Sequence, residues 1–257
     1  MRCPKCGANV PDGKSKCPYC FSPLSDQPYR SFSVNQQNVV NNNEMVTPRK
    51  SSADIYEKNV SAVAIITHDV RDENGKIIGT FAGSGCLISK DGYVMTNTHV
   101  VYDEDTDSVP EYVNVTLDGH TYVGRVLKTY YPPKDHTSLE DLAIIKVDAS
   151  FPNYLRLGDS GTVRNGDEVT AIGNALGLGI NVTRGIVSDT NKLFYGEYFL
   201  ASDVGINGGN SGGPLFNSKG EVIAVCVCSP AMDHEAMNFF IPINHAREIL
   251  RNWGYKF

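Results

Sequence analysis

Ser211 has the surroundings that are richest in chemical meaning, because a pair of glycines lies close on each side of it. The segment from Asn207 to Leu215 reads NGGNSGGPL, which suits neither a helix nor a strand. Glycine backbones adopt conformations closed to other residues, so a tight loop could hold the serine hydroxyl outward with N–H groups converging beside it. Such N–H groups stabilise the oxyanion that forms when a serine attacks a carbonyl. The segment therefore predicts a nucleophilic serine.

His99 and Asp141 are the candidate partners of this serine. A serine hydroxyl needs a general base, and that base needs a group to orient it. His99 lies in an apolar, β-branched run that begins at Tyr93, and Asp141 opens a second apolar run. The order His, Asp, Ser is that of chymotrypsin-type double barrels, whereas subtilisin-like and α/β-hydrolase chains use other orders. Glu140 competes for the orienting role, because alternation along a strand would let only one of two adjacent side chains point inward.

Each of these residues also has an ordinary explanation. A glycine-rich turn can carry an idle serine, and a histidine after a strand is usually a polar loop residue. The occurrence of all three motifs in one chain favours the catalytic interpretation. The remaining histidines lack a comparable setting and are predicted to lie on the surface: His68, His120, His136, His234 and His245.

The blocks around the three residues resemble those of the HtrA/Deg branch of trypsin-like serine proteases. The similarity covers roughly residues 52–252, and its blocks are Gly83–Ser89, Thr96–Val100, Asp141–Lys146, Ile172–Leu178, Thr183–Ser188, Gly209–Leu215 and Phe240–Asn244. For this sequence, the resemblance implies an all-β fold of two six-stranded antiparallel β-barrels with a C-terminal helix. It also implies a serine endopeptidase that hydrolyses protein or unfolded polypeptide substrates, in protein quality control or regulated proteolysis. Relatives of this kind often form homo-oligomers.

The apolar runs supply the strands that two such barrels need. Strands of the first barrel are predicted at 60–66, 81–88, 93–100, 113–117, 122–128 and 142–147. Strands of the second are predicted at 169–172, 182–187, 198–202, 214–216, 222–228 and 238–241. Residues 244–253 predict a terminal helix capped by Asn244. The PDZ modules common in the family are not expected after it.

The resemblance also assigns the rest of the site. It implies an oxyanion hole made by the backbone N–H groups of Gly209 and Ser211, with Asn210 between them. Asn210 stands where many trypsin relatives carry an aspartate that pairs with a freed N-terminus, so zymogen cleavage of that type is not expected. Instead, the hole is expected to be collapsed at rest and to form when a partner or substrate binds. The uncharged residues Ile206, Cys228 and Ser229 are expected to line a pocket for small or medium apolar side chains.

A separate motif lies in the first twenty residues, where two C-x-x-C pairs are separated by ten residues. The four thiolates of Cys3, Cys6, Cys17 and Cys20 match the tetrahedral coordination of structural zinc, and they leave no open position for catalysis. A segment this short cannot fold by apolar burial alone, so metal binding would supply the folding free energy. Two disulfides or a redox pair are the alternatives, although the βαβ context of a redox motif is missing. Residues 1–24 are therefore predicted to form a zinc ribbon.

Composition divides the rest of the chain. Residues 25–51 are rich in Ser, Gln and Asn and are predicted to be a flexible linker, and residues 52–257 are predicted to form the protease domain. No apolar run is long enough to cross a bilayer. The first residues also lack the apolar core of a secretory signal, which predicts a cytoplasmic protein unless a signal or anchor lies outside the sequence given.

Two further functions remain open at this point. A binding protein could use the protease scaffold and the zinc ribbon to hold peptides, with low or conditional turnover. A zinc-ribbon nucleic-acid module is disfavoured by the net charge of −6, because non-specific nucleic-acid binding needs a basic surface. The zinc ribbon could also contact a protein partner. For catalysis itself the triad implies no cofactor.

Overall fold

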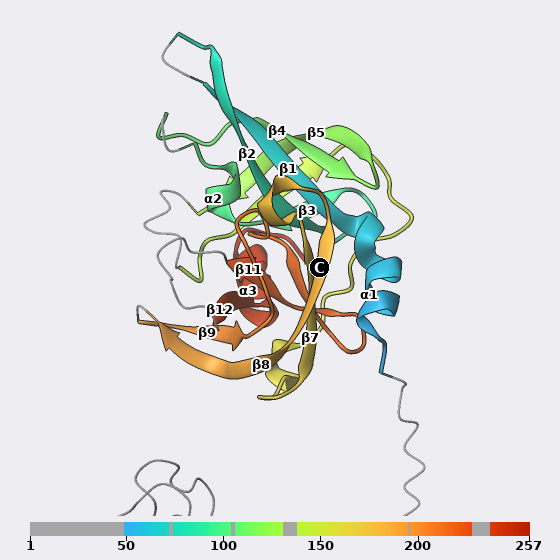
Figure 1. Cartoon of the computed structure of the whole chain (residues 1–257). Helices are drawn as coiled ribbons and strands as arrows, with labels where there is room; N and C mark the ends of the chain where they lie inside the picture. Colours follow the sequence, from blue (N-terminus) through green and yellow to red (C-terminus); the bar gives the residue numbers. More distant parts are fainter. Residues whose placement is uncertain (1–48, 72–73, 104–105, 131–137, 195, 228–236) are drawn as a thin grey trace, which may run out of the picture. The chain divides into compact units, whose positions relative to one another are not determined.

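A computed structural model describes residues 49–71, 74–103, 106–130, 138–194, 196–227 and 237–257. Its strands close into two separate barrels, each of six strands that pair in antiparallel fashion. In Figure 1, β1, β2, β4 and β5 lie in the upper part of the view, and β7, β8 and β9 lie in the lower part. The predicted pair of six-stranded barrels is confirmed.

The first barrel closes in the order β1-β2-β3-β6-β5-β4. Its strands are β1 (Val63–Arg71), β2 (Ile77–Leu87), β3 (Tyr93–Thr96), β4 (Tyr112–Leu117), β5 (His120–Thr129) and β6 (Ala143–Val147). Alternation is clearest in β4, whose Val113, Val115 and Leu117 are buried while Tyr112 and Asn114 are exposed. Because successive side chains point to opposite faces, this pattern fills the barrel and fixes its register.

The second barrel closes in the order β10-β11-β12-β9-β8-β7. Its strands are β7 (Glu168–Gly173), β8 (Asn181–Phe194), β9 (Glu197–Ser202), β10 (Pro214–Asn217), β11 (Val222–Val227) and β12 (Asn238–Pro242). All six residues of β11 are buried, which explains its continuous apolar sequence. Strand β8 is longer than the prediction and continues into a hairpin with β9.

The helices differ more from the predictions. Helix α1 (Ser52–Asn59) was not predicted, but a capping box starts a helix there. The Ser51 hydroxyl accepts the Asp54 N–H, and the Asp54 carboxylate accepts the Ser51 N–H. The terminal helix α3 (Ile243–Asn252) is present, but Asn244 does not cap it. The Asn244 side chain donates instead to the Asp159 carboxylate, at 2.7 Å. The remaining helical segments are α2 (Thr98–Val101) and the 3-10 turns η1 (Val60–Ala62), η2 (Ser160–Thr162) and η3 (Ala175–Gly177).

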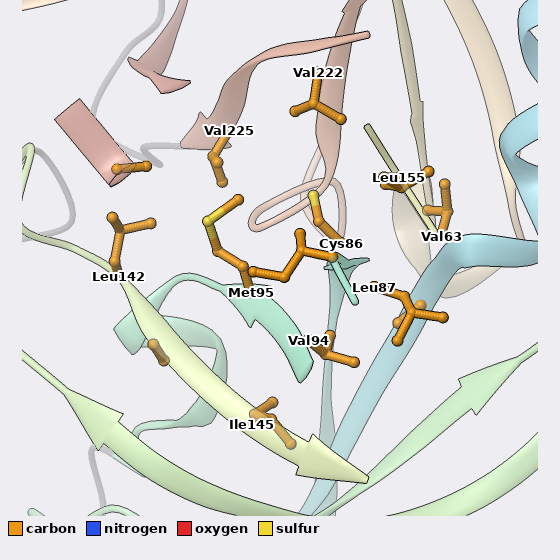
Figure 2. Close-up of a cluster of buried hydrophobic side chains, with 14 of the residues drawn as sticks. Val63, Cys86, Leu87, Val94, Met95, Leu142, Ile145, Leu155, Val222 and Val225 are labelled. Carbon is orange, nitrogen blue, oxygen red and sulfur yellow. The ribbon is translucent and has the colours of Figure 1, made fainter. Parts of the chain in front are cut away.

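One cluster of buried side chains joins the two barrels. Figure 2 shows Cys86 and Met95 of the first barrel beside Val222 and Val225 of the second, all of them buried. Each side chain of this size contributes roughly 1.5–3 kcal/mol when it is fully removed from water. Cys86 is fully buried within this cluster. The shared cluster holds the barrels in one arrangement, so residues contributed by both can meet with fixed geometry.

No described helix has the length and apolar character that would be needed to span a membrane.

Candidate active site

His99 and Asp141 meet through two contacts. The imidazole Nδ1 lies 2.5 Å from Asp141 Oδ2, and the backbone N–H of His99 donates to Oδ1 at 3.0 Å. Both side chains are buried. An ionised carboxylate only accepts hydrogen bonds, so the proton of a neutral imidazole belongs on Nδ1 and Nε2 is left as the basic nitrogen.

The segment that carries His99 is a short helix rather than the continuation of β3. The strand was expected to run to Val100, but it ends at Thr96 and α2 follows. The Asn97 side chain donates to the Asp141 carbonyl at 2.7 Å, and the Thr98 hydroxyl donates to the Leu142 carbonyl at 2.7 Å. These long-range bonds turn the chain out of the strand and fasten the histidine segment to the aspartate segment.

Asp141 is the acid that contacts the histidine, although the reason differs from the one expected. Glu140 and Asp141 both precede β6, so strand alternation does not choose between them. Glu140 lies instead beside Tyr130, whose pKa it raises through a hydrogen bond to the phenol. Asp141 is only 3% exposed.

Ser211 lies in a loop that packs against the segment before His99. The Ser84 N–H donates to the Ser211 carbonyl at 2.8 Å. Gly212 has a φ of +80°, and a Cβ there would collide with the Thr96 hydroxyl and the Ser84 carbonyl. Glycine is therefore required at residue 212 for the nucleophile loop to approach the end of β3 this closely.

The preceding glycines set the direction of the candidate oxyanion-hole donors. The Gly208 carbonyl accepts the Leu176 N–H at 2.6 Å. Since the carbonyl and the N–H of one trans peptide point in opposite directions, the N–H of Gly209 points away from Leu176. Gly209 has a φ of +94°, and a Cβ there would collide with the Asn174 carbonyl. The Asn210 N–H closes the loop on the Asn207 carbonyl at 3.0 Å.

Ser84 is a site residue to which the sequence assigned no role. Its hydroxyl donates to the Gly209 carbonyl at 2.7 Å and accepts the Asn174 N–H at 2.9 Å. With its backbone bond to Ser211, this fully buried serine ties three parts of the site to β2. The available signal was a serine between two glycines inside an otherwise apolar strand.

The other predicted residues are placed only in part. Ile206 is half-buried and packs against the core of the second barrel. Cys228 and Ser229 lie outside the described residues, as do Cys3, Cys6, Cys17 and Cys20 of the predicted zinc ribbon. Within the described ranges, no three His, Cys, Asp or Glu side chains are grouped as a metal site requires.

His68 is not on the surface, contrary to the prediction. It is 5% exposed and stacks on Phe81, with ring centroids 5.6 Å apart. Burial lowers the pKa of His68, an effect that the nearby Asp103 carboxylate opposes. Its packing partner comes from the neighbouring strand, so sequence spacing gave no sign of it.

Known proteins are similar to this chain over most of the barrels. The family described as a trypsin-like peptidase domain matches residues 83–225. A probable periplasmic serine endoprotease DegP-like of Halomonas elongata is 41% identical over 180 residues, which cover 67% of this chain and 35% of that protein. The putative serine protease HhoB of Synechocystis is 38% identical over 66% of this chain and 39% of that protein. The chain thus spans about a third of the length of these curated relatives.

Solved structures of an HtrA-type protease are also similar to this chain. Two structures of the HtrA-type protease AlgW with a tripeptide superpose with a TM-score of 0.65. They are 29% and 30% identical in sequence, and each match covers 79% of this chain and 63% of the other.

The prediction of a cytoplasmic protein is wrong. DegP-like relatives from Halomonas, Brucella and Chlamydia are named periplasmic, which points to a location outside the cytoplasm. The prediction relied on the missing apolar core in the first residues. Such a composition describes those residues alone and does not determine the compartment.

The matched family, the confirmed pair of barrels and the similarity to DegP, HhoB and AlgW agree with one another. The chain belongs to the trypsin-like peptidase family, within which it is similar to the HtrA/Deg serine proteases.

Proposed function

We propose that this chain is a serine endopeptidase that cleaves peptide bonds with His99, Asp141 and Ser211. The observation that carries the proposal is the two-point contact between Asp141 and His99, which lies where the Ser211 loop packs against the end of β3. This arrangement leaves Nε2 of the imidazole as the base for the serine hydroxyl.

In the proposed reaction, Ser211 Oγ attacks the scissile carbonyl while His99 Nε2 takes the hydroxyl proton. Asp141 stabilises the imidazolium that results. The N–H groups of Gly209 and Ser211 then stabilise the negatively charged oxygen of the tetrahedral intermediate. The intermediate collapses as His99 returns the proton to the leaving amine, which gives the acyl-enzyme. Water then attacks the acyl-enzyme while His99 takes its proton, and the second intermediate collapses to release the carboxylic acid and Ser211.

The substrates that fit the proposal are proteins or unfolded polypeptides, cleaved after small or medium apolar residues. The apolar side chain of Ile206 suits a pocket of this kind. The resemblance to the HtrA/Deg proteases assigns Cys228 and Ser229 to the same pocket. The relatives are named as a probable serine endoprotease and a putative serine protease, which fits such cleavage. A role in protein quality control or regulated cleavage belongs to the same proposal through the resemblance to the HtrA/Deg proteases. Assembly into a homo-oligomer belongs to the same proposal.

We also propose a structural zinc ion at the N-terminus, held by Cys3, Cys6, Cys17 and Cys20. Four thiolates are the donor set of a closed structural zinc site, and such a site stabilises its own fold. The zinc ribbon would then be free to contact a protein partner. Metal analysis of the full chain should find zinc that is lost when Cys3 and Cys6 are replaced by serine. Zinc that stays bound to the double variant would contradict this assignment.

Cleavage of an unfolded polypeptide tests the main proposal. The full chain should fragment a reduced and alkylated protein, and Ser211→Ala should abolish the fragmentation while it keeps the fold. The second candidate, a peptide-binding protein on a protease scaffold, predicts retention of the polypeptide by both forms with no fragments from either. If the oxyanion hole is collapsed at rest, as expected, cleavage should begin with a lag. Preincubation of the enzyme with substrate should remove that lag.

A further inference from the structure

The hairpin of β8 and β9 contacts the loop that carries Asp141. Glu197, the first residue of β9, accepts the backbone N–H of Leu139 on its Oε2 at 2.7 Å. The bond is partly buried and joins residues 58 positions apart in the sequence. This hydrogen bond joins the second barrel to the chain segment that links β5 and β6 of the first barrel.

Leu139 lies two residues before Asp141, in a turn whose following N–H groups donate to acceptors within the turn itself. The Asp141 N–H donates to the Ser138 carbonyl at 3.2 Å, and the Glu140 N–H donates to the Ser138 hydroxyl at 3.1 Å. Bonds of this kind shape the turn but do not fix it relative to the rest of the protein. On its downstream side, the turn is held by the bonds from Asn97 and Thr98 to the backbone of residues 141–142. The bond from Leu139 to Glu197 holds its upstream side.

Glu197 is well placed to hold the turn, because aromatic packing fixes the end of the hairpin. Phe194 pairs with Glu197 across the two strands. The Phe194 ring stacks on Phe239 with centroids 4.6 Å apart, and Phe199 meets Phe239 edge-on at 6.0 Å. A carboxylate acceptor on such a support is more strongly oriented than one on a free loop.

We propose that Glu197 is a positioning residue for catalysis, which holds the Leu139 turn so that Asp141 keeps its two contacts with His99. This inference rests on the proposed function. Glu197 touches neither the substrate nor the reacting atoms, and it acts through Asp141. A hydrogen bond from a backbone N–H to a carboxylate is charge-assisted, so its loss leaves a partly buried donor without a strong acceptor.

Two substitutions at Glu197 separate orientation from charge. Glu197→Ala should lower kcat about tenfold with little change in KM, because a small misplacement of catalytic groups costs up to roughly 10²-fold in rate. Glu197→Gln keeps an acceptor oxygen and should restore kcat to within about threefold of the wild type. Glu57→Ala is the matched control, since Glu57 is an exposed glutamate of α1. It should behave like the wild type.

The proton on His99 Nδ1 provides a readout that a loss of general stability would not move. In the wild type it should give a downfield NMR resonance, which should weaken in Glu197→Ala and persist in Glu197→Gln. Equal kcat losses in Ala and Gln would overturn the proposal in favour of a charge effect, and wild-type kcat in Glu197→Ala would overturn it outright. If the wild-type chain itself neither cleaves nor reacts with an active-site probe, the proposed function fails instead.

Discussion

Asp141 binds both the side chain and the backbone of His99. Its Oδ2 lies 2.5 Å from the imidazole Nδ1, and its Oδ1 accepts the His99 N–H at 3.0 Å. One carboxylate therefore fixes the ring orientation and the position of the residue that carries the ring. The side-chain contact also sets the tautomer, which the proposed mechanism requires.

Replacing Asp141 by asparagine should separate catalysis from folding. The amide has nearly the same shape and can still accept the His99 N–H, but it can present its NH₂ group to Nδ1 and stabilise the wrong tautomer. We expect kcat to fall on the order of 10⁴-fold, as wrong-tautomer variants of such triads do. Steady-state cleavage and thermal unfolding of the same sample measure the two effects. Activity close to the wild type would show that Asp141 is not the orienting acid.

The two glycines before Asn210 should respond differently to alanine. At Gly209 a Cβ meets the Asn174 carbonyl at a φ of +94°, whereas at Gly208 nothing lies within 4 Å of an added Cβ. Gly209→Ala should distort the candidate oxyanion hole and lower kcat by about 10²–10³-fold, the usual cost of losing one donor. Gly208→Ala is the matched control and should lose far less. Equal activities in the two variants would show that Gly209 does not contribute to the oxyanion hole.

Ser84→Ala should weaken the site while leaving the barrel closed. The hydroxyl bonds to the backbones of Gly209 and Asn174 would be lost, at a cost of roughly 0.5–1.5 kcal/mol of unfolding free energy each. We expect kcat to decrease by a larger factor than the factor by which KM changes. Ser89→Ala, which removes a comparable bond to the Tyr93 N–H, is the control away from the site. If Ser89→Ala reduces kcat as much as Ser84→Ala, the effect is general and the role given to Ser84 is wrong.

His68 should make the fold sensitive to acid. Burial lowers its pKa in the folded chain, so below the ordinary value of about 6.5 the unfolded chain binds more protons than the folded one. The free energy of unfolding therefore decreases as pH falls through that range, until the folded histidine also titrates. His68→Phe keeps the stack on Phe81 and removes the titration.

Chemical denaturation at about pH 7.5 and about pH 5.5 measures this effect, because carboxylate titration is common to the wild type and His68→Phe and cancels in their difference. The variant should lose less stability than the wild type on acidification. An identical loss in both proteins would show that His68 is not the acid-sensitive group.

Features that depend on local pattern could be predicted from the sequence. The strands follow the apolar runs, and the glycines around Ser211 correctly predicted a tight loop. Helix α1 was missed although its signal was present, since Ser51 and Asp54 have the spacing of a capping box.

Features that depend on distant contacts could not be predicted in this way. Thr98 and Val100 are β-branched and favour a strand, yet bonds to residues 141–142 draw this segment into a helix. The two roles of Ser84 and the bond from Leu139 to Glu197 join residues that are 58 or more positions apart. No local pattern contains such pairs.

In the proposed mechanism, Ser211 is a nucleophile that His99 activates. Labelling with a fluorophosphonate probe, followed by mass spectrometry of the modified peptide, tests it most directly. We expect the full chain to be labelled at Ser211 in the presence of unfolded polypeptide, and Ser211→Ala and His99→Ala to remain unlabelled. Labelling at another residue, no labelling of the folded wild-type chain, or equal labelling of His99→Ala would contradict it.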